Sequence, residues 1–379
     1  MKFTINRSAF IKELTNVQRA ISSKTTIPIL TGLKLDVATE GITLTGSDAD
    51  ISIETTIPAD DDNNTLVVED AGSIVLPARF FSEIVKKLPE DTMTVAVTDG
   101  FQTQITSGAA SFTINGLDPE NYPHLPEIDT TNTITLAGDV FKELIGQTVI
   151  AVSNQESRPI LTGVHFILAD GEFLAVATDS HRLSQRKIKL PEANNANYDV
   201  IIPGKSLTEL SRMIGDDNPD VQMRLSENQV LFVLGHTSFY SRLLEGNYPD
   251  TSRLIPKESN TTVEIEAPAL SAAIERASLL SHESRNNVVR FSVNPTDKTI
   301  TIFGNSPDVG EVTEQLQPAE LDGDELEISF NPDYMKEALR SFGQAMIKIS
   351  FTMALRPFTL VPTEEGENFI QLITPVRTF

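Results

Sequence analysis

The 379-residue sequence predicts an α+β fold made of three tandem repeats of one domain, each with two helices and roughly eight short strands. Pro-Ile-Leu-Thr-Gly occurs twice, at 28–32 and at 159–163. Asn-Tyr-Pro also occurs twice, at 121–123 and at 247–249. The two offsets, 131 and 126 residues, are nearly equal, and the same order of apolar patterns lies between the motifs in both copies. A third, fainter copy of that order follows, so we predict a threefold internal repeat.

The period of about 130 residues indicates repeats that are domains in their own right. The units of solenoid proteins are much shorter, roughly 20–50 residues. A chain of 379 residues is also too long for one ordinary hydrophobic core. The Pro-rich polar segments that follow both Asn-Tyr-Pro motifs are typical of linkers. We therefore predict domains at residues 1–128, 129–257 and 258–379.

Each repeat begins with a pattern typical of an amphipathic helix, with apolar residues spaced by three and four positions. We expect these helices at 8–22, 139–152 and 268–281, with Ser8 and Asp139 as N-caps of the first two. The apolar positions of the first helix are Phe10, Leu14, Val17 and Ile21. A second helix is expected later in each repeat, at 79–88, 205–214 and 332–342.

Strands are predicted between the two helices of each repeat, because apolar residues alternate there with polar ones. The alternating apolar positions are Leu33, Leu35 and Val37, then Val164, Phe166 and Leu168, then Val289, Phe291 and Val293. Further alternating strands close each unit, among them 101–105, 230–234 and 347–351.

Composition excludes several classes of protein. The sequence has no cysteine, which rules out disulfides, thiolate metal sites and a cysteine nucleophile. No apolar run approaches the ~18 residues that a membrane-spanning helix needs. The first residues, Met-Lys-Phe-Thr-Ile-Asn, do not resemble a signal peptide. We expect a cytoplasmic protein.

Charge is distributed unevenly along the chain. The formal net charge of −23 argues against a nucleic-acid partner when it is taken as a whole, because phosphate contacts need Lys and Arg. The six predicted helices, however, hold eleven Lys and Arg against eight Asp and Glu, a net of +3 that leaves −26 for the remainder. Equivalent helices of repeated domains are expected to line one face together. Such a face suits an anionic partner held by diffuse contacts.

The common catalytic motifs are absent from the sequence. It contains no phosphate-binding loop, no His-Glu-x-x-His and no Gly-x-Ser-x-Gly. The five histidines are scattered without metal-ligand spacing. Asp48 and Asp50 form the one pair of acids that suggests metal chemistry, but an acidic turn at a strand end is the commoner interpretation.

One polar cluster, Ala-Thr-Asp-Ser-His-Arg-Leu at 177–183, invites a catalytic interpretation. A hydrolase would use Asp179, Ser180 and His181. Adjacent residues of a strand point to opposite faces, which is poor geometry for a serine and its base. A structural turn and a binding loop are the other two interpretations, and we favour the binding loop.

Taken together, the three repeats and the motifs at 177–183, 247–250 and 373–377 resemble the bacterial DNA polymerase sliding clamps, the beta subunit of the polymerase III holoenzyme. The resemblance implies a head-to-tail homodimer, a six-domain ring around duplex DNA with helices inside and sheets outside. Twelve helices spaced by ~8–10 Å give a circumference of ~100–120 Å, which leaves room for a duplex. The family implies a processivity factor without catalysis, cofactor or metal.

The family's DNA-facing positions map onto one set of residues in this sequence. By resemblance these are Lys24, Arg79, Gln155, Arg158 and Lys205. Their position on the predicted helices adds Lys12, Arg19, Lys86, Lys142, Arg212, Arg276 and Arg340.

The resemblance also implies a pocket at the junction of the second and third domains. There the family binds a short linear peptide with Gln and apolar anchors, carried by the replicative polymerase, the clamp loader and other proteins. The residues implied are Leu161, Thr178, Ser180, His181, Arg182, Leu183, Pro249, Arg253, Leu254, Leu372, Thr374, Pro375, Val376 and Arg377. Apolar walls with a few polar groups suit such a site.

At the implied dimer contact, Phe112 of one chain packs on Leu279 and Leu280 of the other. The segment 107–113 holds no Lys or Arg that could pair with Glu311 or Glu314 of the partner. A monomeric peptide-binding scaffold without a nucleic-acid role is the alternative.

Overall fold

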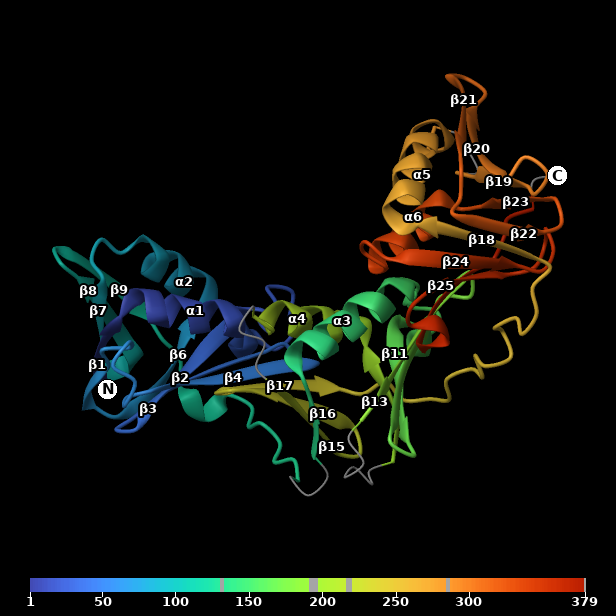
Figure 1. Ribbon diagram of the computed structural model, residues 1–379. Helices are drawn as coiled ribbons and strands as arrows, with labels where there is room; N and C mark the ends of the chain where they lie inside the picture. The colour runs from blue at the N-terminus through green and yellow to red at the C-terminus, as the bar shows by residue number, and fades with distance from the viewer. Residues whose placement is uncertain (130–132, 191–196, 216–219, 284–286, 378–379) are drawn as a thin grey trace. The chain divides into compact units, whose positions relative to one another are not determined.

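The structure, a computed structural model, describes residues 1–129, 133–190, 197–215, 220–283 and 287–377. The chain divides into two compact units, Met1–Phe141 with Glu209–Leu243 and Lys142–Thr208 with Leu244–Phe379. Figure 1 follows the chain from the N-terminus to the C-terminus by colour. Phe379 and part of the polar stretch 282–286 of the third repeat lie outside the described residues.

The order of elements repeats three times among the described residues, except that the second repeat has one strand fewer between its two helices. The first repeat has β1 (Lys2–Asn6), α1 (Arg7–Gln18), β2 (Gly32–Ala38), β3 (Gly41–Ser47), β4 (Ile51–Pro58), β5 (Val67–Asp70), β6 (Gly72–Pro77), α2 (Ala78–Lys87), β7 (Thr92–Val97), β8 (Gln102–Ser107) and β9 (Ala110–Asn115). The second has β10 (Thr133–Leu136), α3 (Gly138–Thr148), β11 (Gly163–Ala169), β12 (Glu172–Thr178), β13 (Arg182–Lys189), β14 (Tyr198–Pro203), α4 (Gly204–Met213), β15 (Val221–Leu225), β16 (Gln229–Leu234) and β17 (Thr237–Arg242). The third has β18 (Thr261–Glu266), α5 (Ala267–Ser281), β19 (Val289–Asn294), β20 (Thr299–Ser306), β21 (Gly310–Leu316), β22 (Glu320–Gly323), β23 (Leu326–Phe330), α6 (Pro332–Ser341), β24 (Met346–Phe351), β25 (Phe358–Pro362) and β26 (Phe369–Ile373).

The alternating patterns form strands whose apolar side chains are buried, as predicted. The residues Leu33, Leu35, Val37, Val164, Phe166, Leu168, Val289, Phe291 and Val293 are all at most 4% exposed. In the third repeat the core is closed by aromatic rings, with Phe351 5.7 Å from Phe291 and 5.1 Å from Phe358 between ring centroids. Burying one such ring contributes roughly 1.5–3 kcal/mol, so these patterns supply much of the driving force for the fold.

The predicted N-caps of the first helices were wrong. Helix α1 follows β1 directly, and the side chain of Asn6 caps it by accepting a hydrogen bond from the Ala9 N–H at 3.1 Å. Ser8 therefore lies inside the helix. Asp139 lies in the first turn of α3, which begins at Gly138, and its carboxylate accepts from the next residue's N–H at 2.8 Å. The change arises because strand and helix join without a loop.

Two of the predicted helices are also shorter than expected. Helix α1 ends at Gln18, so Ile21 lies beyond it, and α3 ends at Thr148. A 3₁₀ turn, Val149–Ala151, continues the chain after α3. In the second repeat Pro-Ile-Leu-Thr forms a further 3₁₀ turn, Pro159–Thr162, with Leu161 buried. Both turns lie in the connection between α3 and the next strand of the repeat.

The sheets run across the boundaries between repeats. In the first unit the strand orders are β5-β1-β7-β8-β9 and β10-β15-β16-β17-β4-β3-β2-β6, and in the second they are β14-β11-β12-β13-β26-β25-β24-β18-β22 and β21-β20-β19-β23. The last strand of the second repeat, β17, pairs with β4 of the first, with Tyr240 opposite Ser52 (Figure 1). The last strand of the third, β26, pairs with β13 of the second, with Leu372 opposite Leu183. We call these pairings the first and the second junction.

Candidate peptide-binding and DNA-facing sites

The second junction carries a small apolar surface. Leu183 and Leu372 face each other across the strand pairing, and with Val176 they form a buried cluster. Leu174 and Ile255, both partly buried, pack against this cluster. Opposed side chains of an antiparallel pair lie close enough to form one surface. The strands thus bring predicted pocket residues that are 189 positions apart in the sequence into direct opposition.

A tight turn at 179–181 borders this surface and fixes the polar pocket residues. The Asp179 carboxylate accepts hydrogen bonds from the backbone N–H groups of His181 at 2.9 Å and Arg182 at 3.0 Å. The Thr178 hydroxyl donates to the Arg182 carbonyl at 2.6 Å and accepts from the Ser180 N–H at 3.2 Å. Ser180 adopts a φ of 78°, a conformation that Asx-type turns tolerate. The backbone is thereby held, and the His181 side chain is presented to solvent.

Tyr248 anchors the linker that carries Pro249 beside the turn. Its hydroxyl accepts a hydrogen bond from the Thr178 N–H at 3.0 Å, and its ring stacks on His165 at 4.8 Å between centroids. Burial raises the pKa of Tyr248 to about 12, although the hydrogen bond from Thr178 opposes the shift. Leu254, on the same linker, is 50% exposed. The linker is therefore held in place at Tyr248 and presents the exposed apolar side chain of Leu254 a few residues later.

The C-terminal segment forms another part of the border. The Thr374 N–H donates to the His181 carbonyl at 2.9 Å, and the Val376 N–H donates to the Ser329 carbonyl at 2.8 Å. Thr374, Pro375 and Val376 are half-buried as a result, and Arg377 is exposed. Of the fourteen predicted pocket residues, Leu161 lies on the 3₁₀ turn Pro159–Thr162. The other thirteen lie on the turn at 179–181, the linker, β13, β26 and the residues next to these segments in the sequence.

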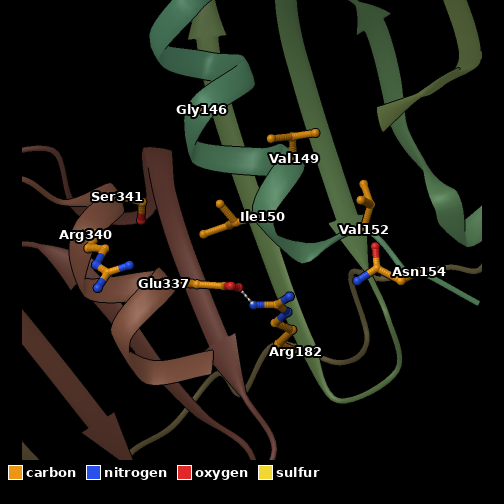
Figure 2. A pocket seen from close by; sticks show the side chains of 9 residues that line it. All are labelled: Gly146, Val149, Ile150, Val152, Asn154, Arg182, Glu337, Arg340 and Ser341. Carbon is orange, nitrogen blue, oxygen red and sulfur yellow. Dashed lines mark hydrogen bonds and ion pairs between the residues drawn. The ribbon is translucent and has the colours of Figure 1, made fainter. Parts of the chain in front are cut away.

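Arg182 links the turn to helix α6. Its guanidinium forms ion pairs with Asp179 at 3.0 Å and with Glu337, and lies 4.5 Å from the centre of the Tyr334 ring. Figure 2 shows the Arg182–Glu337 pair at the edge of a pocket of about 410 Å³, with Ile150 facing α6 across it. Such cation–π and ion-pair contacts hold a guanidinium in one orientation. Arg182 is therefore a rigid part of the site.

Tyr334 and Glu337 were not predicted as site residues. The apolar residues of α6, among them Met335 and Leu339, form its buried stripe. Tyr334, Glu337 and Ser341 lie on an adjacent stripe with the same helical spacing. This spacing was the one sequence feature that could have indicated them as site residues. Sequence alone did not indicate that Arg182 lies against this stripe.

Asp179, Ser180 and His181 do not have the geometry that the hydrolase interpretation requires. The Ser180 hydroxyl accepts a hydrogen bond from Arg158 at 3.1 Å, and the His181 ring stacks on Tyr334 at 6.4 Å between centroids. Asp179 is occupied by the turn and by Arg182. The three side chains therefore do not form the serine–base–acid chain that nucleophilic catalysis requires.

Asp48 in the first repeat has the same local role as Asp179. Its carboxylate accepts from the N–H groups of Asp50 at 3.1 Å and Ile51 at 2.8 Å. In the part of the chain that the structure describes, no three His, Asp or Glu side chains are grouped to hold a metal ion. Both acidic motifs are thus explained by turn formation.

The predicted DNA-facing residues differ in exposure and in ion pairing. Lys12, Lys24, Lys86, Gln155, Arg158 and Lys205 are exposed, whereas Lys142 is half-buried. Five arginines are ion-paired within the chain, namely Arg19 with Glu209 at 3.2 Å, Arg212 with Glu209 at 2.6 Å, Arg79 with Glu83 at 3.2 Å, Arg340 with Glu275 at 3.1 Å and Arg276 with Glu314. Their charge is partly neutralised, which weakens any attraction to phosphate.

The predicted dimer residues are apolar and at least partly accessible. Phe112 on β9 is 40% exposed and Leu279 on α5 is 71% exposed, while Leu280 is half-buried. Strand β9 ends one sheet and β21 ends another, so each has one edge without a paired strand among the described residues.

Comparison with known proteins matches the whole chain. The N-terminal, central and C-terminal domains of the DNA polymerase III beta subunit match residues 1–126, 135–250 and 252–377. The chain belongs to the DNA polymerase III beta subunit family. It is 49% identical to the beta sliding clamp of Bacillus subtilis and 43% identical to that of Staphylococcus epidermidis, with all of each chain covered.

Solved structures of beta subunits agree with this fold over their full length. The DNA polymerase sliding clamp of Bacillus subtilis superposes with a TM-score of 0.96 at 49% identity. The DNA polymerase III beta chain of Streptococcus pneumoniae superposes with a TM-score of 0.96 at 45% identity, and both comparisons cover all of each chain. The predicted three-domain clamp fold of helices and antiparallel strands is thereby confirmed. The function of this beta-subunit chain is that of a DNA sliding clamp.

Proposed function

We propose that two copies of the chain close head to tail into a six-domain ring around duplex DNA, with the helices lining the hole and the sheets outside. The observation that carries this proposal is the pairing at the two junctions. At each of them the last strand of one repeat pairs with the fourth strand of the repeat before it. In the part of the chain that the structure describes, the last strand of the first repeat, β9, and the fourth strand of the third, β21, have no such partner.

Pairing of β9 with the partner's β21 continues the pattern and closes the ring. The register follows from the first junction, where Phe239 lies opposite Ile53. The repeats place Phe112 where Phe239 lies and Val312 where Ile53 lies. Phe112 should therefore lie opposite the partner's Val312, with Leu279 and Leu280 of the partner nearby. A closed ring also leaves neither of these edges open to aggregation.

The ring is proposed to hold DNA by topology. The exposed Lys12, Lys24 and Lys86 supply diffuse phosphate contacts, and the paired arginines keep those contacts weak enough for sliding. The acidic remainder of the surface repels DNA from elsewhere. After loading, the protein should stay on circular nicked DNA and leave once the DNA is linearised. Equal retention on both forms would show ordinary binding and refute the ring.

The second junction is proposed to bind short peptides of the replicative polymerase, the clamp loader and other replication proteins. The apolar cluster of Val176, Leu183 and Leu372 suits apolar anchors, and the fixed turn at 179–181 supplies polar groups for a Gln side chain. The fourteen predicted pocket residues are retained in this proposal. A fluorescent peptide with these anchors should bind, and should lose affinity when Leu254 is truncated.

Several further expectations belong to the same proposal. Domain boundaries are placed at 128/129 and 257/258, close to the ends of the segments that the family domains match. No catalysis and no cofactor are expected, so a Ser180→Ala protein should keep clamp function. Localisation is proposed to be cytoplasmic. Among the described helices none is long and apolar enough to cross a membrane.

The alternative is a monomeric peptide-binding scaffold, which no particular contact among the described residues favours. Light scattering separates the two, because the ring requires a dimer. A monomer at micromolar concentration would refute the ring but would leave peptide binding at the second junction unaffected.

A further inference from the structure

A second pocket lies at the first junction, within the first unit. It has a volume of about 550 Å³ and lies between β2, β3, β4, β15, β16 and β17 on one side and the linker 122–128 on the other. Pockets of this size accommodate two or three residues of a peptide. Neither the ring nor the second-junction site uses this pocket.

The repeat relates this pocket to the proposed peptide site. Ser52 takes the place of Leu183, because each lies five residues after the end of the equivalent strand, and Tyr240 opposite Ser52 takes the place of Leu372. Thr45 takes the place of Val176 by the same offset of 131 residues. The three residues of the apolar cluster are thus replaced by hydroxyl-bearing side chains.

The linkers match in the same way. Tyr122 is the counterpart of Tyr248, and its hydroxyl donates to the Thr45 carbonyl at 3.4 Å. Burial raises the pKa of both tyrosine hydroxyls. Each linker is therefore anchored by a buried tyrosine beside a pocket, although the contacts of the two hydroxyls differ. The scaffold is shared and the chemistry of its lining has changed.

Two charged groups of the pocket, Glu54 and Arg224, form no ion pair among the described residues, although Lys34 acts on Glu54 electrostatically. Glu54 is half-buried, and its carboxylate accepts a hydrogen bond from the Thr45 hydroxyl at 3.3 Å, while the nearby Lys34 is already paired with Asp36 at 2.9 Å. Arg224 donates to the Gln222 amide oxygen at 2.8 Å, but its Nε is buried without a partner. A half-buried charge without a partner costs free energy that a ligand of opposite charge recovers.

We propose that the first-junction pocket binds an extended peptide segment of a partner protein, with a basic side chain on Glu54 and a carboxylate on Arg224. The opposite charges of Glu54 and Arg224 favour a ligand that carries both signs over a purely apolar anchor. The proposal goes beyond the ring. From the proposed second-junction site it takes only the class of ligand, a peptide. The equivalence of the two junctions rests on their strand pairing, not on peptide binding at the second junction.

The test uses the full-length protein with methyl-labelled leucine and short peptides as probes. The probes are acetylated, amidated peptides of glycine with one Lys and one Glu, either adjacent or separated by one residue, and neutral versions with Gln at both positions. Leu231 and Leu125 report on the first-junction pocket, and Leu183 and Leu372 report on the second junction. We expect saturable shifts at Leu231 and Leu125 with a charged peptide and none with the neutral ones.

Two variants test the assigned contacts. Glu54→Gln and Arg224→Gln should each weaken binding at least fivefold, while Glu40→Gln and Arg356→Gln, at exposed positions outside the pocket, should leave it unchanged. Glu54→Gln keeps an acceptor for the Thr45 hydroxyl and should remain folded, which circular dichroism checks. The proposal is overturned if no charged peptide shifts Leu231 and Leu125, if neutral peptides bind equally, or if neither variant matters. Failure of peptide binding at Leu183 and Leu372 alone would refute only the second-junction site.

Discussion

Arg276 on α5 holds Glu314 on β21 through two hydrogen bonds of 2.8 and 2.5 Å. The hydrogen bonds and charge of Arg276 lower the pKa of Glu314, although desolvation opposes them. Glu314 is therefore engaged within its own chain, at the edge strand that we propose pairs with the partner's β9. Since β9 holds no Lys or Arg, apolar contact and backbone pairing remain to hold the dimer.

Truncation of Phe112 should break the dimer. Loss of a large apolar side chain at the centre of an interface costs about 2 kcal/mol. Each ring has two interfaces, so Phe112→Ala should raise the dissociation constant several hundredfold, by about 4 kcal/mol. Phe80→Ala is the matched control, because Phe80 is 61% exposed on α2, away from β9. Sedimentation measures the dissociation constants of both variants.

The dissociation constant of the wild-type dimer should depend little on salt. It should change less than about threefold between 0.05 and 0.5 M NaCl, and a steep salt dependence would contradict an apolar interface.

Truncation of Leu254 should weaken peptide capture without unfolding the protein. Its side chain is 50% exposed, so Leu254→Ala removes little buried area in the free protein. We expect the affinity for a peptide with Gln and apolar anchors to fall about tenfold, which corresponds to about 1.4 kcal/mol. Leu355→Ala, at a loop residue that is 47% exposed, should have no effect. Fluorescence anisotropy measures binding, and an equal loss in both variants would argue against the assigned site.

Tyr248 should make stability depend on pH in the alkaline range. Burial raises its pKa from an ordinary value near 10 to about 12, so the folded state keeps a proton that the unfolded state releases. This contribution is complete below pH ~10 and is lost as pH rises toward 12, at about 1.4 kcal/mol per unit.

The variant Tyr248→Phe isolates this effect, because Tyr122 and the other tyrosines are present in both proteins. At pH 8 the variant should be less stable by about 1 kcal/mol, since the Thr178 N–H loses its acceptor. At pH 11 the difference should shrink by about 1 kcal/mol. Urea unfolding at the two pH values measures it, and a constant difference would mean that the hydroxyl titrates normally.

Lys24 and Arg19, both predicted to face DNA, should respond differently to substitution. Lys24 is exposed, so Lys24→Gln should speed loss from circular DNA and lower the salt dependence by about 1 per phosphate contact. Arg19 is 26% exposed and paired with Glu209, so Arg19→Gln should chiefly reduce stability, by about 1 kcal/mol. Retention on DNA at several salt concentrations, together with thermal unfolding, separates the two. Identical behaviour would show that the ion pair opens on DNA.

The repeats and the burial of their strands were predictable from the amino-acid sequence. Apolar periodicity reports directly on which side chains are buried, as with Leu33 and Phe291, and repeated motifs report on repeated domains. The same periodicity predicted the positions of the helices to within a few residues. Helix starts were less predictable, because Asn6 caps α1 from the end of a strand and local propensity alone favoured Ser8.

The surroundings of the functional side chains were decided by tertiary structure alone. Arg19 meets Glu209 across 190 positions of sequence, and Arg182 meets Tyr334 and Glu337 on a helix of another repeat. Such pairs depend on which surfaces the strand pairing brings together, and a linear pattern does not record that. Residue types and their spacing thus determined the repeated fold and the candidates for its sites. The long-range strand pairing at the junctions decided which charges are neutralised and which pockets are apolar or charged.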